Sequence, residues 1–182
     1  SAISMYILDM DVHSRKWNLI VKGIKSVDNE KEVDTRNEVK LAKKLGIDAE
    51  RAEATRLSAC HRMAQTKDSA IFIRFTDLKD RDEWISNARN LTVADKISIS
   101  PDMPPKIRPL KTDLLDFRKA MPIDEKHTAK IKHLKSFPYV QMTYGTEQEK
   151  STRTTKKSKF EIMQDLIDFH ELPDISVEET VG

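Results

Sequence analysis

Residues 68–75 read Asp68-Ser69-Ala70-Ile71-Phe72-Ile73-Arg74-Phe75. Successive side chains of a β-strand point to opposite faces of the sheet, so Ile71, Ile73 and Phe75 would share one face. Ala70, Phe72 and Arg74 would share the other. The large apolar side chains predict that the first face is buried, and the guanidinium predicts that the second is exposed. We therefore expect a strand of a half-buried sheet, around which the other elements of its domain are arranged.

An earlier stretch predicts a neighbouring strand. Residues 17–24 alternate as well, with Leu19 and Val21 on the core side and Gly23 near the end of the run. The side chains expected on the exposed face of the two strands are Asn18, Ile20, Lys22, Phe72 and Arg74. An aromatic ring and cations on one face suit base stacking and phosphate contact. The alternative is that this face packs against a second domain or a partner.

The surrounding sequence predicts the order strand, helix, strand, strand, helix, strand. The first helix is expected from Asn29, whose side chain would cap it together with Glu32, and it would stop at Gly46. Its apolar line is Val39, Ala42 and Leu45. The later elements are a strand at residues 56–63, a helix from Thr76 or Asp77 to about Asn90, and a strand at residues 96–100. This order is the ferredoxin-like βαββαβ arrangement, an α+β fold with helices on one face of the sheet.

A second domain is expected after three prolines, Pro101, Pro104 and Pro105, because proline interrupts helices and favours extended backbone before it. A helix that starts at Pro109 would have the apolar stripe Ile107, Leu110, Leu114, Phe117 and Met121. The segments that follow are a β-hairpin formed by residues 128–134 and 138–144, a polar connection at 145–158, and a last helix with Phe160, Met163, Ile167 and His170. The second domain would thus be a small α+β unit of helix, hairpin and helix.

The chain is expected to have four parts: an N-terminal helical segment at residues 1–15, the first domain at 16–101, the second domain at 102–172 and an acidic, disordered tail at 173–182. In the first part, Ile3, Ile7 and Met10 predict one or two helical turns with an apolar seam, as at the end of a coiled coil. Two turns cannot associate stably alone. This segment would therefore either pack on a domain or be disordered.

Charge is distributed unevenly along the chain. The formal net charge is only +2, but residues 105–160 hold 14 Lys/Arg and 6 Asp/Glu, a net charge of +8, whereas residues 161–182 hold 7 Asp/Glu and no Lys or Arg. Clustered cations bind phosphates with little regard to sequence, so the second domain is a candidate nucleic-acid site. The alternative is that these charges form an ordinary solvated surface.

Composition excludes several other classes. No apolar run approaches the roughly 18 residues of a membrane-spanning helix, and residues 1–13 lack the layout of a secretory signal. The single cysteine, Cys60, cannot form an internal disulfide, which favours a cytoplasmic or nuclear protein. It lies beside His61 on an expected strand, so the two side chains would point to opposite faces and could not act as nucleophile and base. Without a phosphate loop or metal-ligand spacing, we expect no enzyme, no cofactor and no metal.

The order of elements, together with Leu19-Ile20-Val21-Lys22-Gly23-Ile24 and Phe72-Ile73-Arg74-Phe75, resembles an RNA-recognition motif (RRM) that is poor in aromatic residues. Three further segments extend the likeness: Cys60-His61-Arg62-Met63, Lys79-Asp80-Arg81-Asp82-Glu83 with Ala88-Arg89, and Ile99-Ser100-Pro101-Asp102-Met103. Over about Trp17 to Leu172, the chain is similar to the first open-reading-frame proteins of LINE-type retrotransposons, in which an RRM precedes a small C-terminal domain.

The resemblance implies a nucleic-acid chaperone and packaging protein of a cytoplasmic ribonucleoprotein, which could also enter the nucleus. It would bind single-stranded RNA, and DNA as a second candidate, and form a trimer through a coiled coil upstream of this chain. The residues expected to bind nucleic acid are Asn18, Lys22, Arg62, Phe72, Arg74, Arg108, Lys111, Arg118, Lys130, Lys132 and Tyr139. Tyr139 would either stack beside Lys130 and Lys132 or lie in the core.

A second function remains open at this point. The sheet and the basic domain could instead form a protein-interaction module that docks an acidic partner, such as the chain's own acidic end at residues 161–179.

Overall fold

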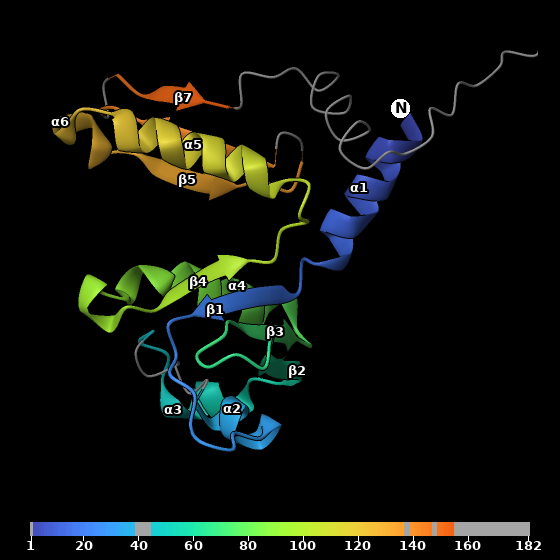
Figure 1. Cartoon of the computed structure of the whole chain (residues 1–182). Helices are drawn as coiled ribbons and strands as arrows, with labels where there is room; N and C mark the ends of the chain where they lie inside the picture. Colours follow the sequence, from blue (N-terminus) through green and yellow to red (C-terminus); the bar gives the residue numbers. More distant parts are fainter. Residues whose placement is uncertain (1, 39–44, 137–138, 147–148, 155–182) are drawn as a thin grey trace, which may run out of the picture. The chain divides into compact units, whose positions relative to one another are not determined.

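The computed structural model describes residues 2–38, 45–136, 139–146 and 149–154. The chain is a mixed α+β protein with antiparallel sheets, and it divides into two compact units. The four-stranded unit comprises residues 13–102, and the three-stranded unit comprises residues 2–12 with the described residues from 103 onward. Both are drawn in Figure 1.

The four-stranded unit contains a fully antiparallel sheet whose strands lie in the order β2-β3-β1-β4. The strands are β1 (Asn18–Lys22), β2 (Leu57–Arg62), β3 (Ile71–Phe75) and β4 (Ser98–Pro101). The helices are α2 (Glu32–Glu38), α3 (Ala49–Ala54) and α4 (Leu78–Asn87), and two short 3₁₀ turns, η2 (Ala88–Asn90) and η3 (Val93–Asp95), precede β4. Along the chain the elements follow one another as β1, α2, α3, β2, β3, α4, η2, η3 and β4, and α3 was not predicted.

The alternation of β3 is confirmed. Ile71, Ile73 and Phe75 are buried, whereas Phe72 and Arg74 are half-buried on the other face. Figure 1 shows α4 beside the sheet, and its Trp84 packs edge-on against Phe75 with ring centroids 5.4 Å apart. The apolar core of this unit also includes Leu19, Val21, Ile24, Leu45, Ile47 and Cys60. Both predicted core residues of β1 therefore lie where the pattern placed them.

Several predicted boundaries in this unit were wrong. The strand expected from Asp68 begins at Ile71, because Asp68 adopts a left-handed backbone conformation in the preceding turn. The last strand begins at Ser98 rather than Lys96 because Lys96, also left-handed, ends η3. The first helix begins at Glu32, since Asn29 is left-handed and cannot act as its N-cap.

Three other local features follow from named residues. The backbone N–H of Lys31 donates to Asp34 of α2, which caps the first turn of that helix. The additional helix α3 is held against α4 because its Arg51 forms ion pairs with Asp80 and Glu83 of α4. Asp77 caps α4, as predicted, by accepting from the backbone N–H of Lys79. Val39 and Ala42 lie outside the described residues.

Gly23 ends β1 for a steric reason. Its φ is +94°, and a Cβ there would lie 1.9 Å from the carbonyl oxygen of Lys96. Any larger residue would push apart the chain segments that lead out of β1 and into β4.

The three-stranded unit contains an antiparallel sheet in the order β5-β6-β7. The strands are β5 (Lys130–His133), β6 (Val140–Tyr144) and β7 (Ser151–Arg153), and the helices are α1 (Ala2–Ser14, of which residues 2–12 belong here), α5 (Arg108–Ala120) and α6 (Ile123–Lys126). Figure 1 shows α5 lying along this sheet. The hairpin β5–β6 and the helix α5 were predicted, whereas α6 and β7 were not.

The core of this unit lies between α5 and one face of the sheet. The predicted stripe of α5 is confirmed, since Ile107, Leu110, Leu114 and Met121 are buried and Phe117 packs against them. Strand β7 lies in the segment expected to be a polar connection. Three polar residues have no apolar alternation to reveal a strand, and their pairing comes from the backbone.

The N-terminal segment is helical, as predicted, and the side chains of its predicted seam differ in burial from those of its other face. Ile3, Ile7 and Met10 are exposed, whereas Met5 and Leu8 are buried in the core of the three-stranded unit. Helix α1 packs on this core through Met5 and Leu8, and the hydroxyl of Tyr139 donates to Asp9 on the same helix. The last helix expected at 160–170 and the acidic tail lie outside the described residues.

Candidate nucleic-acid interface

The sheet of the four-stranded unit presents a second face opposite its core, which we call the platform face. Register places four of its side chains in one row across the sheet, in the order Ser100, Ile20, Phe72 and His61. A neighbouring row holds Asn18, Arg74 and Ala59. Lys22 lies opposite Ser98 at the end of β1 and is exposed. The platform face therefore comprises these eight residues and Ser98, drawn from all four strands.

The two rings of the first row stack on each other. His61 of β2 and Phe72 of β3 have ring centroids 5.2 Å apart and an angle of 29° between their planes. His61 is exposed and Phe72 is half-buried. Sequence reasoning missed His61 as a site residue, because the histidine becomes relevant only through the register that sets it opposite Phe72.

Asn18 was expected to be exposed, but it is only 5% exposed. Its amide nitrogen donates to Asp102 over 3.0 Å, and its amide oxygen accepts from Arg74 over 3.0 Å. Arg15 completes the network with an ion pair of 3.0 Å to Asp102. The network joins the start of the unit to its end, so Asn18 and Arg74 both have structural partners. Ile20, expected on the exposed face as well, is 8% exposed.

Arg74 also has an aromatic neighbour. Its guanidinium carbon lies 5.5 Å from the centroid of the Trp17 ring, within the range of a cation–π contact. A second bond runs from the guanidinium to the backbone oxygen of Ser14 over 3.2 Å. Arg74 is therefore held at the end of β3 with half of its surface covered.

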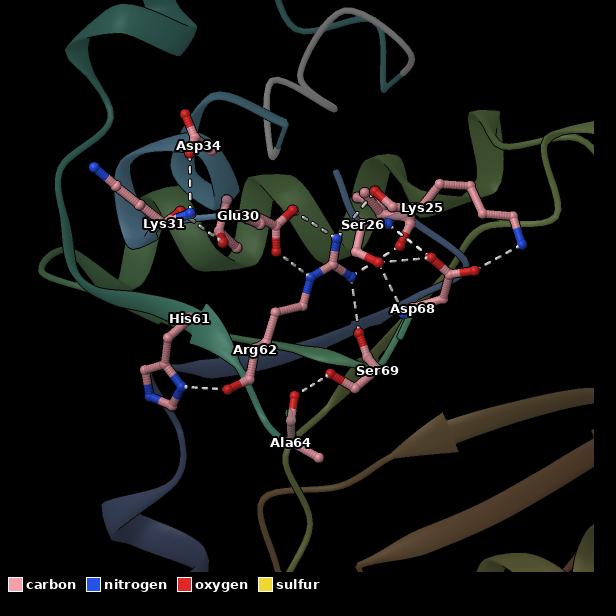
Figure 2. Close-up of polar contacts among 12 residues, drawn as sticks. Lys25, Ser26, Glu30, Lys31, Asp34, His61, Arg62, Ala64, Asp68 and Ser69 are labelled. Carbon is pink, nitrogen blue, oxygen red and sulfur yellow. Dashed lines mark hydrogen bonds and ion pairs between the residues drawn. The ribbon is translucent and has the colours of Figure 1, made fainter. Parts of the chain in front are cut away.

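Arg62, a predicted nucleic-acid ligand, is the centre of an internal clamp (Figure 2). Its guanidinium donates to both carboxylate oxygens of Glu30, over 2.7 Å and 3.0 Å. It also donates to three backbone oxygens, those of Ile24, Lys25 and Ser69. An arginine has five N–H donors, so these contacts occupy all of them.

The clamp is partly buried and charged. The Arg62 side chain is 13% exposed and that of Glu30 is 7% exposed. Hydrogen bonds from Arg62 hold the pKa of Glu30 below its ordinary value. In this arrangement Arg62 joins β2 to the loop after β1 and to the turn before β3, and it has no donor left for a phosphate.

A second anchor beside the clamp is Asp68, also shown in Figure 2. Its carboxylate accepts from the backbone N–H of Ser26 over 2.7 Å, from the Ser26 hydroxyl over 3.0 Å and from Lys25 over 3.0 Å. These bonds, with that of the Ser26 N–H the largest cause, lower the pKa of Asp68 to about 2.

The sheet of the three-stranded unit has an outer face, opposite α5, which we call the lysine face. Lys130 and Lys132 lie on β5 directly opposite Thr143 and Gln141, and Thr143 in turn lies opposite Thr152. Both lysines are exposed, and neither forms an ion pair with any residue that the structure describes. The sequences of β5, β6 and β7 contain no Asp or Glu.

The other predicted cations of this unit lie on or beside α5. Arg108 is exposed at its first turn, whereas Lys111 and Arg118 are half-buried along it. Arg153 of β7 lies over the Phe117 ring, with 3.5 Å between the guanidinium carbon and the ring centroid. Arg153 thereby covers the core side of the sheet rather than its outer face.

Tyr139 is a core residue. It is 2% exposed and lies in the apolar cluster with Met5, Leu8 and Val140. Of the two alternatives that the sequence left open, the structure favours the core position, and the ring has no free face on which a base could stack.

No model of a known protein family matches the chain, and the search of curated proteins found no match either. No helix among the described residues is long and apolar enough to cross a membrane. The same residues contain no group of three or more His, Cys, Asp or Glu side chains that could hold a metal ion.

Proposed function

We propose that this protein binds single-stranded nucleic acid, RNA in the first place, with little sequence preference, and that it packages and remodels RNA in a cytoplasmic ribonucleoprotein. The lysine face carries the proposal. It presents two exposed ammonium groups among uncharged polar side chains, and no carboxylate in its three strands opposes them.

Such a face suits phosphates rather than bases. An ammonium on a flexible stem is a point charge without the bidentate geometry that reads base edges. Each phosphate that it neutralises releases counterions, so binding would be nearly independent of sequence and would weaken steeply with salt. Thr143, Thr152 and Gln141 can add hydrogen bonds to the sugar-phosphate backbone of the bound nucleic acid.

The fold of the other unit supports the proposal. We interpret its strand order β2-β3-β1-β4, with α3 as an additional helix, as that of a ferredoxin-like domain such as an RRM, whose sheet binds single-stranded RNA. The resemblance to the first open-reading-frame proteins of LINE-type retrotransposons points the same way, and it would make the protein a retrotransposon chaperone that forms trimers through an upstream coiled coil. Exposed Lys22 and the His61–Phe72 pair are the groups that this sheet can offer.

A salt titration tests the proposal. The affinity for a fluorescent oligouridylate, measured by anisotropy between about 50 and 200 mM salt, should fall with a slope of about −0.7 for each phosphate contact. Absence of micromolar binding at the lowest salt would refute it. A polyglutamate peptide that binds more tightly than RNA at the same salt would favour the alternative, a module that docks acidic proteins.

The matched control keeps the same change of net charge. Lys31→Ala with Lys79→Ala removes two exposed lysines at α2 and α4, away from both proposed faces. This variant should bind RNA as the unmodified protein does, whereas Lys130→Ala with Lys132→Ala should bind more weakly. Equal losses would mean that the lysine face is not the site.

A further inference from the structure

The platform face contains a stacked pair of rings whose two members are not equivalent. Phe72 is internal in its row, with Ile20 directly opposite on β1 and His61 directly opposite on β2. Both of its flanks are therefore occupied by side chains. His61 has Phe72 on one side only, because β2 is an edge strand of the described sheet.

The exposures agree with that order. Along the row, Ile20 is buried, Phe72 is half-buried and His61 is exposed. From Ile20 to His61, exposure therefore increases from a buried aliphatic side chain to an exposed imidazole. A flat ring brought from solution meets His61 first.

The His61 ring is also held in place. Its Nδ1 lies 3.0 Å from the backbone oxygen of Arg62 (Figure 2). A carbonyl oxygen can only accept, so this contact places the proton on Nδ1. The bond and the Phe72 ring together restrict rotation of the imidazole about its own axis.

The element beneath the ring is rigid as well. Arg62, the next residue on β2, donates all five of its N–H groups to Glu30 and to three backbone oxygens. An aromatic ring held on a fixed strand loses little conformational entropy when a ligand stacks on it. The pair is thus pre-organised before any ligand arrives.

We propose that His61, supported by Phe72, is the ring on which this protein stacks one unpaired base of a single-stranded nucleic acid. The inference rests on the proposed function and deepens it, because it assigns the base contact to a residue that the RNA-binding pattern of β1 and β3 does not include. Base stacking is tolerant of sequence, since every base has a π-face. The contact therefore requires an unpaired base without selecting which one.

The test separates a stacked base from a bound phosphate. One ligand is an oligouridylate, and the other is a strand of the same length and charge whose sugars carry no bases. Replacing His61 by Ala should weaken binding of the oligouridylate by about 5-fold or more, the lower limit for one stacked base. The same variant should bind the abasic strand as tightly as the unmodified protein does.

Two further variants complete the test. His61→Phe keeps a ring and should keep the affinity for the oligouridylate, whereas His61→Gln keeps a polar group without a ring and should lose it as His61→Ala does. Equal binding of the oligouridylate by His61→Ala and the unmodified protein would overturn the inference. So would an equal loss on both strands, because an effect that does not need a base is not stacking.

The proposed function fails in a different way. If the unmodified protein binds neither strand at low salt, nucleic-acid binding itself is refuted. If it binds both with the expected salt dependence while the His61 variants change nothing, only the assignment of the base contact is wrong.

Discussion

The two sheet faces of this protein both carry cations, but these cations differ in their partners. On and beside the platform face, Asn18, Arg62 and Arg74 are bonded to other parts of their own unit. On the lysine face, Lys130 and Lys132 extend from β5 without an ion-pair partner among the described residues. A cation that is predicted from sequence can therefore be a structural tie or a ligand contact, and only its partners decide which.

The chemistry of the cations follows the same division. The planar guanidinium of Arg62 reaches several acceptors at once, which suits a partly buried clamp. The lysines are compact charges on flexible stems, which suits a phosphate backbone that moves. Substitutions that exchange these roles should show which face holds the fold and which holds the ligand.

Loss of the Arg62 clamp is expected to have the largest effect. Arg62→Met leaves the partly buried Glu30 carboxylate and three backbone oxygens without their donor, which costs about 3 kcal/mol of unfolding free energy. Urea denaturation followed by circular dichroism measures the change. Arg56→Met, at an exposed position just before β2, is the matched control and should change stability by less than about 0.5 kcal/mol. A folded, equally stable Arg62→Met that has lost RNA affinity would instead make Arg62 a ligand contact.

The lysine face should show the largest effect on binding. Two lost phosphate contacts at about 0.1 M salt correspond to a roughly 25-fold lower affinity and a salt slope smaller by about 1.4. Phe72→Ala should weaken binding less than Lys130→Ala with Lys132→Ala does, because it removes the support of a single stacked ring. Filter binding of both variants over a range of salt concentrations measures the two losses of affinity. A larger loss for Phe72→Ala would mean that the platform face contributes more to binding than the lysine face.

Asn18 should behave as a structural residue of intermediate weight. Asn18→Ala leaves the carboxylate of Asp102 and the guanidinium of Arg74 without one partner each, which costs about 1 to 3 kcal/mol. RNA affinity measured well below the unfolding temperature should stay within about 2-fold, since a buried amide has no access to a ligand. A loss of RNA affinity without a loss of stability would instead show that Asn18 contacts the nucleic acid.

The sequence was a good guide wherever the apolar pattern is strong. The alternation of Ile71, Ile73 and Phe75 predicted β3, and the spacing of Leu110 and Leu114 predicted α5. It failed where other forces decide. Strand β7 depends on backbone pairing alone, and the spacing of Ile3, Ile7 and Met10 gives no sign that α1 buries Met5 and Leu8 on another face.

The candidate site was harder to predict than the fold for a related reason. Exposure of Lys130 and Lys132 follows from strand parity, which is a local property. The partners of Arg62 come from positions 24 to 69, and the ring opposite Phe72 is set by the register of β2. Neither can be derived from residues that are neighbours in sequence, so the arginine was assigned to the ligand and the histidine was overlooked.

Asp68 offers the smallest effect and a test of the same division through pH. Its pKa is about 2 in the folded protein, below the ordinary value of an aspartate, so its contribution to stability is fully present above about pH 4 and is lost as the pH falls through 2. Asp68→Asn keeps a residue that tolerates the left-handed backbone at this position. In urea denaturation, the unmodified protein should lose more stability than this variant between pH 5 and pH 2. RNA affinity at neutral pH should be the same for both proteins. Asp68 is bonded to Lys25 and Ser26, so, like Arg62, it holds the four-stranded unit together and does not contact the ligand. Parallel pH curves for the two proteins would show that the carboxylate does not hold the turn before β3.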